Sequence, residues 1–262
     1  MISPAVLVLG GLLAADAPAL PEGNAYVRAL VQKQRDREAL LDTYTYDISS
    51  VREELDASGA VRSRRTQSFQ TFHVKGRPLR RLVAEDGRPL SAGRQARENE
   101  RVAGMAADIR AGRVAVEQPG LRLSAILERF DFRAVDREVV EGRAAVVLDF
   151  TARPGERDIK GDRVLRRLRG RLWVDEAEQE IVRAEIRNTE PIKVGLGVGA
   201  SVSRVESRFE FQKVDGVAWL PWRVLTFAEG RKLLLKSFRT RVTLIYAGFR
   251  RFDVQSEESV RP

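Results

Sequence analysis

The apolar and polar positions of the chain have a helical period near the amino terminus and a period of two over much of the remaining sequence. Residues 24–41 place apolar side chains about one helical turn apart, which predicts an amphipathic helix with Asn24 as its N-cap. From Thr43 the period changes to two, so alternate side chains face one side of a predicted strand. Those side chains are Tyr44, Tyr46 and Ile48.

The same alternation predicts about ten strands, joined as sequential antiparallel hairpins. After the strand that begins at Thr43, the predicted strands are residues 61–74, 79–84, 132–140, 144–152, 170–175, 181–188, 202–214, 217–227 and 231–249. Turn residues separate several of them, at 141–142, 175–178, 215–216 and 229–230. The Asp215-Gly216 pair is the strongest hairpin signal, because both central positions of a type I′ turn need positive φ.

Three segments interrupt the strands. Residues 91–110 are rich in Ala, Arg, Glu and Gln, which predicts a surface helix with Ser91 as its N-cap. Residues 121–130 predict a second helix, and residues 153–169 predict a loop with a short helical run. Because no strand–helix–strand alternation is present, we expect an α+β fold: a curved antiparallel sheet with an amino-terminal helix and inserted helices covering one face.

Charged residues are abundant but mixed in sign. They make up 32% of the chain, and the formal net charge is +9, carried mostly by Arg. Basic and acidic residues alternate in segments such as 97–101 and 136–138, which is typical of solvated surfaces, and the sequence has no aromatic-plus-basic strand of the kind that binds RNA. We therefore predict no nucleic-acid partner and expect an anionic membrane surface to match the positive charge better.

The absence of Cys and the presence of a single His restrict the chemistry. Without Cys there is no disulfide, thiolate nucleophile or Cys metal site, and His73 alone cannot supply the imidazoles of a His-based zinc site. We expect a structural role for His73. Neighbouring acids such as Glu53 and Glu54, or Asp175 and Glu176, point to opposite faces of a strand and do not converge as a catalytic pair. The prediction is a non-enzymatic protein with no metal and no cofactor.

An apolar run at residues 5–15, followed by small residues at Ala-X-Ala spacing, predicts a signal peptide over residues 1–19. A single domain is then expected over residues 20–262. The run is shorter than a transmembrane helix requires. No Lys or Arg precedes it, so a buried amino-terminal strand is the alternative interpretation. Because no Cys follows to carry a lipid, we expect a soluble, exported protein of the periplasm.

Short motifs in the second half of the chain resemble a known family. They are GRLWVD at 170–175, IVRAE at 181–185, FEF at 209–211 and VDGVAWLP at 214–221. Together they resemble the carboxy-terminal sheet of the outer-membrane lipoprotein carrier superfamily, which contains LolA-like, LolB-like and RseB-like proteins. The resemblance covers mainly residues 140–250. It implies a strongly curved sheet, an unclosed barrel, whose concave face is apolar and covered by helices; in that family this cavity accepts the acyl chains of lipoproteins or serves as a sensor surface.

From this resemblance we predict a carrier or sensor that binds the acyl chains of a lipid or lipoprotein in an apolar cavity on the concave face. The period of two supplies candidate contacts on three predicted strands. They are Tyr44, Tyr46, Ile48, Val146, Leu148, Phe150, Phe238, Val242, Leu244 and Tyr246. The alternative is a structural or protein-interaction module of the cell envelope with a filled core and no ligand. No functional residue of the family is matched to a position of this chain, and the oligomeric state stays open.

Overall fold

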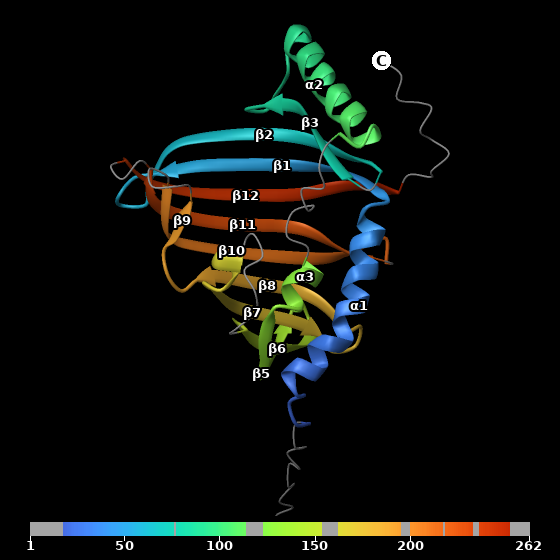
Figure 1. Ribbon diagram of the computed structural model, residues 1–262, viewed down its shortest axis with the longest axis vertical. Coiled ribbons are helices and arrows are strands. Elements are labelled where there is room, and N and C mark those ends of the chain that lie inside the picture. Colours follow the sequence, from blue (N-terminus) through green and yellow to red (C-terminus); the bar gives the residue numbers. More distant parts are fainter. Residues whose placement is uncertain are drawn as a thin grey trace, which may run out of the picture.

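A single twelve-stranded sheet forms the body of the protein (Figure 1). The computed structural model describes residues 18–75, 77–113, 123–153, 162–194, 200–216, 218–232 and 236–251. The strands, in chain order, are β1 Tyr44–Leu55, β2 Val61–Val74, β3 Arg77–Glu85, β4 Arg88–Pro89, β5 Phe130–Val140, β6 Arg143–Ala152, β7 Leu168–Asp175, β8 Glu180–Asn188, β9 Ile192–Val194, β10 Ala200–Val214, β11 Ala218–Lys232 and β12 Lys236–Arg251.

The order of strands across the sheet is β4-β3-β2-β1-β12-β11-β10-β8-β7-β6-β5, and β9 pairs with β10. Each pair of neighbours is antiparallel, as sequential hairpins require. The last strand, β12, lies beside β1, so the sheet joins segments from the two ends of the described chain. Ile48 lies opposite Tyr246 in this pair. The predicted fold class, an unclosed antiparallel sheet with helices, is confirmed.

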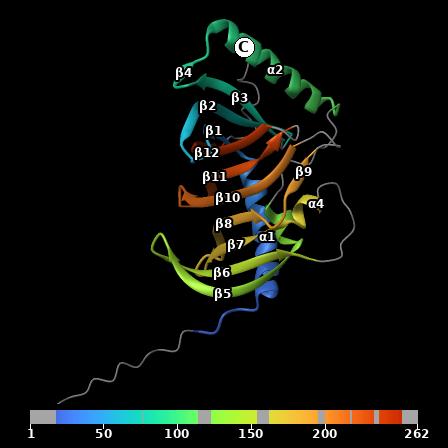
Figure 2. The same ribbon diagram turned by 90° about the vertical axis from the view of Figure 1, so that its left-hand side faces the viewer.

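Four helices accompany the sheet in the described residues: α1 Gly23–Leu41, α2 Ala92–Arg110, α3 Leu123–Leu127 and α4 Asp162–Leu165. α1, α3 and α4 lie on one side of the sheet, which we call the helix-covered face, whereas α2 lies beyond β3 at the sheet edge (Figures 1 and 2). We call the other side the opposite face. None of the described helices is both long and apolar enough to cross a membrane. Residues 1–17, most of the predicted signal peptide, lie outside the described residues.

The main core lies on the helix-covered face, between α1 and the strands from β5 to β8. Side chains of α1 such as Val27 and Leu30 are 2% and 3% exposed and pack against the inward-facing positions of these strands. Gly23 permits this close approach, because a Cβ at that position would lie 2.3 Å from the carbonyl oxygen of Phe132. The helix therefore begins where only glycine fits against β5.

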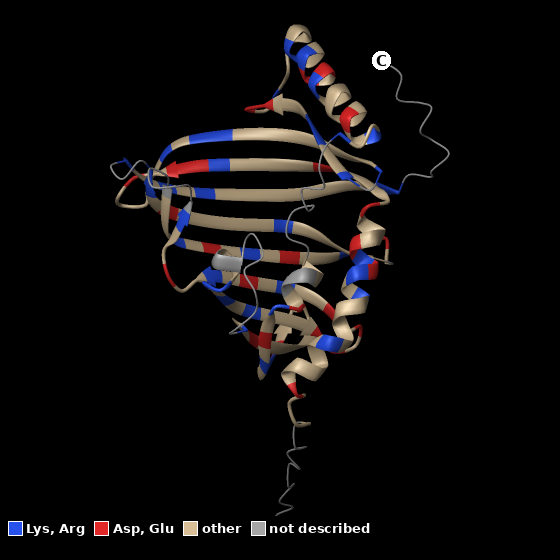
Figure 3. Cartoon of the chain, viewed as in Figure 1, with Lys and Arg blue, Asp and Glu red and all other residues tan. Residues whose placement is uncertain are grey.

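A second, smaller core lies on the opposite face near the β5–β6 turn. Its buried members are Val140, Ala145, Val147, Trp173, Val182 and Trp219. Because Val146 and Leu148 are buried on the helix-covered face while Val147 is buried on the other, β6 is covered on both sides. Charged residues are spread along the remaining strand surfaces and the helices (Figure 3).

Two predicted helix boundaries differ from the structure. The N-cap of α1 is Glu22, whose carboxylate accepts hydrogen bonds from the backbone N–H groups of Asn24 and Ala25. The Asn24 side chain instead accepts a 2.8 Å hydrogen bond from the backbone N–H of Phe132 and so links the helix to β5. The helix predicted at 121–130 is the shorter α3, because Phe130 already begins β5. Ser91 is the N-cap of α2, without a side-chain capping bond.

The hairpin turns are confirmed with one exception. At Glu141-Gly142 and Asp215-Gly216 both residues have positive φ, as type I′ turns require. The turn predicted at residues 229–230 is wrong, because β11 continues to Lys232. Gly230 is needed there for a different reason: a Cβ would lie 2.1 Å from the carbonyl oxygen of Ser201 in the neighbouring strand.

Candidate functional site

The predicted ligand contacts all lie on the helix-covered face, in two groups. Val146, Leu148 and Phe150 on β6 are at most 3% exposed and belong to the main core under α1. The ring of Phe150 packs at an edge-to-face angle on Phe130, and it lies where a Cβ of residue 170 would be, so Gly170 makes room for it. These three side chains are therefore packed in the core and line no open surface on the helix-covered face.

The second group lies on β1 and β12, and four of its side chains, Tyr44, Tyr46, Ile48 and Tyr246, gather at one end of this strand pair. Tyr44, Tyr46 and Ile48 are 6%, 6% and 1% exposed, and the Tyr46 ring lies 5.9 Å from Tyr246 and 5.4 Å from Phe249. Burial raises the pKa of Tyr46 to about 12, with the Tyr246 phenol adding to the rise. Burial also raises the pKa of Tyr246. Both phenols are therefore neutral at physiological pH, as an apolar environment favours.

His73 belongs to the edge of this aromatic group. Its side chain is 3% exposed, its ring centroid lies 6.3 Å from that of Tyr46, and its Nε2 lies 3.7 Å from the Asp42 carboxylate. The structure thus places the single histidine in a packed environment, in agreement with the structural role that we expected.

The strand register connects the two groups through two neighbouring rows of residues, one continuously apolar and one mostly apolar, which we call the apolar rows. One row runs across the sheet from β12 to β5, with each residue directly opposite the next: Leu244, Val224, Phe209, Ala184, Leu172, Leu148 and Ala134. The adjacent row contains Val242 at one end and Phe150 near the other. The β6 ends are buried, whereas Val242, Leu244 and Phe238 on β12 are only half-buried. The rows therefore lead from a closed core to a more accessible apolar surface.

Polar groups on these rows are few, and two of them satisfy each other. Ser207 and Thr226 lie directly opposite on β10 and β11, and their hydroxyl oxygens are 3.0 Å apart. A hydroxyl that is already hydrogen-bonded costs less to cover with an apolar group than an unpaired one. On the β1 side, Ser50 lies opposite Leu244 and Arg52 lies opposite Val242, so the apolar surface ends at β12.

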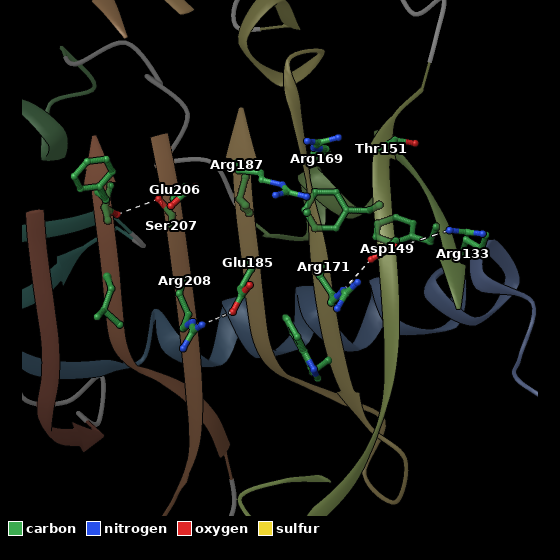
Figure 4. A pocket seen from close by; sticks show the side chains of 18 of the residues that line it. Arg133, Asp149, Thr151, Arg169, Arg171, Glu185, Arg187, Glu206, Ser207 and Arg208 are labelled. Carbon is green, nitrogen blue, oxygen red and sulfur yellow. Dashed lines mark hydrogen bonds and ion pairs between the residues drawn. The ribbon is translucent and has the colours of Figure 1, made fainter. Parts of the chain in front are cut away.

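A cavity of about 980 Å³ lies on the opposite face of the sheet, with α1 behind the strands that form its floor (Figure 4). Half of its described lining residues are charged, and the others include Phe150, Trp173, Leu225 and Phe227. The charged residues are Asp131, Arg133, Asp149, Arg169, Arg171, Glu185, Arg187, Glu206, Arg208 and Arg241. This charged hollow is not the apolar cavity that the sequence predicts, because it differs in both face and chemistry. Sequence reasoning missed it, since each arginine on its own looks like a solvated surface residue.

One file of residues across the charged hollow alternates in charge on five neighbouring strands. Arg133, Asp149, Arg171, Glu185 and Arg208 lie directly opposite one another in that order, and we call this file the charge ladder. Ion pairs link Arg171 to Asp149 at 2.9 Å and Arg208 to Glu185 at 2.7 Å. The hydrogen bond to Asp149 raises the pKa of Arg171. The recurrence of charged residues at i and i+2 on successive strands is the sequence signal that indicates such a file.

A second polar network lies beside the small core of the opposite face. The Glu178 carboxylate accepts hydrogen bonds from Trp219 Nε1 at 2.8 Å, Lys213 Nζ at 2.9 Å and Arg143 Nη2 at 2.8 Å. These donors, Trp219 first, lower the pKa of Glu178 to about 2. Asp175, 1% exposed, pairs with the same Arg143 at 2.6 Å. Because each of these carboxylates is engaged by donors, the network fixes the β7–β8 turn against β10 and β11. In the described chain, no group of three His, Cys, Asp or Glu side chains is placed to hold a metal ion.

Comparison with known proteins gives similarity in structure only. No family model and no curated protein matches the sequence. A domain named as an outer-membrane lipoprotein-sorting protein from Vibrio parahaemolyticus is 11% identical, with a TM-score of 0.40 over 90% of this chain and 94% of that chain. A LolA superfamily protein from Nitrosomonas europaea is 10% identical, with a TM-score of 0.41 over 87% and 94%. A DUF1329 family protein from Desulfovibrio piger is 14% identical, with a TM-score of 0.39 over 90% and 95%.

Proposed function

We propose that this protein is a non-enzymatic binding protein of the periplasm, which holds an acyl chain of a lipid or lipoprotein on the helix-covered face. The observation that carries the proposal is the set of apolar rows across the sheet, buried at β6 and half-buried at β12. The occupied region is the β12 end of these rows, around Val242 and Leu244. The buried residues Val146, Leu148 and Phe150 support that surface from within the core.

The dimensions of the surface suit an acyl chain. Phe238 and Tyr246 are eight residues apart on β12, and at about 3.4 Å per residue the strand between them spans roughly 27 Å. One leaflet of a bilayer core is roughly 15 Å deep, half of the 30 Å hydrocarbon thickness. An extended acyl chain therefore fits along β12 in contact with side chains that alternate onto this face. An acyl chain needs no hydrogen-bond partner, which agrees with the mutual pairing of Ser207 and Thr226.

The first test is the mass of the native protein. Native mass spectrometry with lipid extraction, on protein from a periplasmic preparation, is expected to detect a bound acyl-chain species. The same preparation tests the predicted export, since a protein retained in the cytoplasm would contradict that part of the proposal. A clean apo mass would count against carriage of a lipid.

Two substitutions at neighbouring positions of β12 test which face of the sheet binds the acyl chain. Val242→Arg places a charge on the helix-covered face, whereas Thr243→Arg places the same charge on the opposite face of the same strand, because successive strand residues alternate. We expect V242R to weaken binding of a fluorescent long-chain fatty acid at least tenfold, since burying an unpaired charge against an acyl chain is costly, and T243R to leave it within about twofold. Thermal unfolding of both variants checks that each is folded. Equal losses in the two variants would contradict the proposed face.

The alternative, a structural or protein-interaction module with a filled core, has one observation in its favour. Val146, Leu148 and Phe150, three of the predicted ligand contacts, are packed under α1 and leave no open surface at β6. If the native mass shows no lipid and the fatty acid does not bind, this module becomes the better interpretation of the same sheet.

A further inference from the structure

The charged hollow contains a second file of residues, next to the charge ladder, in which the alternation of charge fails. Along this file Thr151, Arg169, Arg187 and Glu206 lie directly opposite one another on β6, β7, β8 and β10. Two arginines are therefore cross-strand neighbours. Opposed like charges in a sheet are destabilising, and Cβ atoms of directly opposite residues are only about 4.5–5.5 Å apart.

Neither of these two arginines is neutralised by a carboxylate within the described chain. Glu206, opposite Arg187, is engaged instead by Arg204 of its own strand, through bonds of 2.9 Å and 3.0 Å. On the other side of Arg169 lies Thr151, a neutral hydroxyl. By contrast, the acids of the charge ladder are each paired with a ladder arginine. The described structure thus leaves a local excess of two positive charges at Arg169 and Arg187.

The two arginines lie on neighbouring strands at one end of the charged hollow, and Thr151 lies beside Arg169 (Figure 4). We call these three residues the anion niche. They lie on β6, β7 and β8, which are paired with one another along their length. On the other face of these strands, Leu148, Leu172 and Ala184 are buried in the main core. The sheet therefore holds both arginines in the lining of a preformed cavity, so little backbone ordering is needed for a ligand to bind.

We infer that the anion niche binds a dianionic phosphate group, with Arg169 and Arg187 as the two cationic contacts and the Thr151 hydroxyl as a neutral donor. Guanidinium groups bind phosphate oxygens through paired N–H donors. The two negative charges of the phosphate group balance the two positive charges of Arg169 and Arg187, whereas a carboxylate would balance only one of them. Such a ligand removes the cross-strand repulsion, so binding and stability are linked.

This inference is independent of the proposed function. The anion niche is on the opposite face, and the thickness of the sheet separates it from Val242 and Leu244. The phosphate group can belong to a soluble phosphate compound or to a lipid headgroup at a membrane surface, and the two sources are told apart by the probe. Loss of fatty-acid binding in V242R and loss of phosphate binding in variants of Arg169 and Arg187 are separate results.

The test compares thermal unfolding in sodium phosphate and in sodium chloride of the same ionic strength. The variants are Arg169→Gln, Arg187→Gln and the double variant; the control is Arg62→Gln, which removes the same charge from an exposed position of β2. We expect phosphate to raise the Tm of the wild type and of R62Q above the value in chloride. In R169Q and R187Q the concentration of phosphate needed for the same rise is expected to increase about tenfold or more, as for loss of a charged hydrogen bond.

A second readout needs no ligand. In low salt without phosphate, R187Q is expected to have a higher Tm than R62Q, because only R187Q removes a repelling cross-strand neighbour. Vesicles of phosphatidylcholine with phosphatidic acid then identify the source. Sedimentation that is lower for R187Q than for R62Q indicates a lipid phosphate, whereas equal sedimentation of these two variants, with the phosphate-dependent Tm shift of the wild type retained, indicates a soluble one. An equal phosphate effect in the wild type and the double variant would overturn the inference, since it would reflect a general salt effect.

Discussion

Glu178 is one side chain that links the stability of this fold to pH. Its carboxylate receives three side-chain donors, from Trp219, Lys213 and Arg143, and its pKa is lowered from 4.5 to about 2. A carboxyl group whose pKa is depressed by folding stabilises the protein above its unfolded value, and the stabilisation is lost as the pH falls through the folded value. The relevant window is therefore from about 4.5 down to about 2.

Glu178→Gln tests this link. At pH 7 we expect the variant to lose about 1 to 2 kcal/mol of unfolding free energy, because charge-assisted hydrogen bonds become neutral ones. The difference from the wild type is expected to shrink between pH 4.5 and pH 2.5. Urea unfolding at several pH values measures it, with Glu54→Gln, an exposed acid of β1, as the control. A difference that stays constant with pH would show that Glu178 is not the group that titrates.

At the scale of elements, glycines that look alike in sequence have different roles in the structure. Gly142 and Gly216 occupy turn positions with positive φ, whereas Gly230 lies inside β11, paired with Phe238. The Glu229-Gly230 dipeptide resembles a turn when only its own sequence is considered. What decides its role is the backbone of Ser201, which the fold brings to the same place from another strand.

Gly230→Ala is expected to destabilise the protein by about 2 kcal/mol or more, because the new methyl group overlaps the Ser201 carbonyl and one strand must move. Gly104→Ala is the matched control. Gly104 is in α2 with open space around its Cβ position, and alanine there is expected to stabilise by up to about 1 kcal/mol. The two Tm shifts should have opposite signs. A Tm rise in both would mean that residue 230 has room for a side chain.

The period of two was sufficient to predict most strands and the face on which Tyr46, Leu148 and Leu244 lie. It was not sufficient to predict their neighbours, because the pairing of β12 with β1 is a contact between distant parts of the chain. The predicted N-cap Asn24 failed for a similar reason, since its side chain is used by Phe132 of β5. The charged hollow was missed because it depends on register: alternation along a strand is visible in the sequence, but the opposition of Arg169 and Arg187 appears only when β7 and β8 are aligned.

At the scale of the whole molecule, the net charge of +9 and the apolar rows predict two kinds of membrane attraction that respond differently to salt. Attraction between the basic surface and anionic headgroups is screened, since the Debye length falls from about 10 Å at 0.1 M salt to about 3 Å at 1 M. Contact between an acyl chain and the Val242 side chain is not weakened in this way, because hydrophobic burial does not depend on charge.

Flotation with vesicles separates these two contributions. With vesicles rich in phosphatidylglycerol, we expect most of the wild-type protein to float at low salt and most to be released at 1 M salt. Vesicles of phosphatidylcholine, which has no net charge, are expected to bind little protein at either salt concentration. V242R adds a positive charge, so it is expected to float at least as well as the wild type at low salt while losing affinity for the free fatty acid. If flotation persisted at 1 M salt and was abolished in V242R, apolar insertion through the β12 surface would be the dominant membrane contact and the basic surface would be secondary.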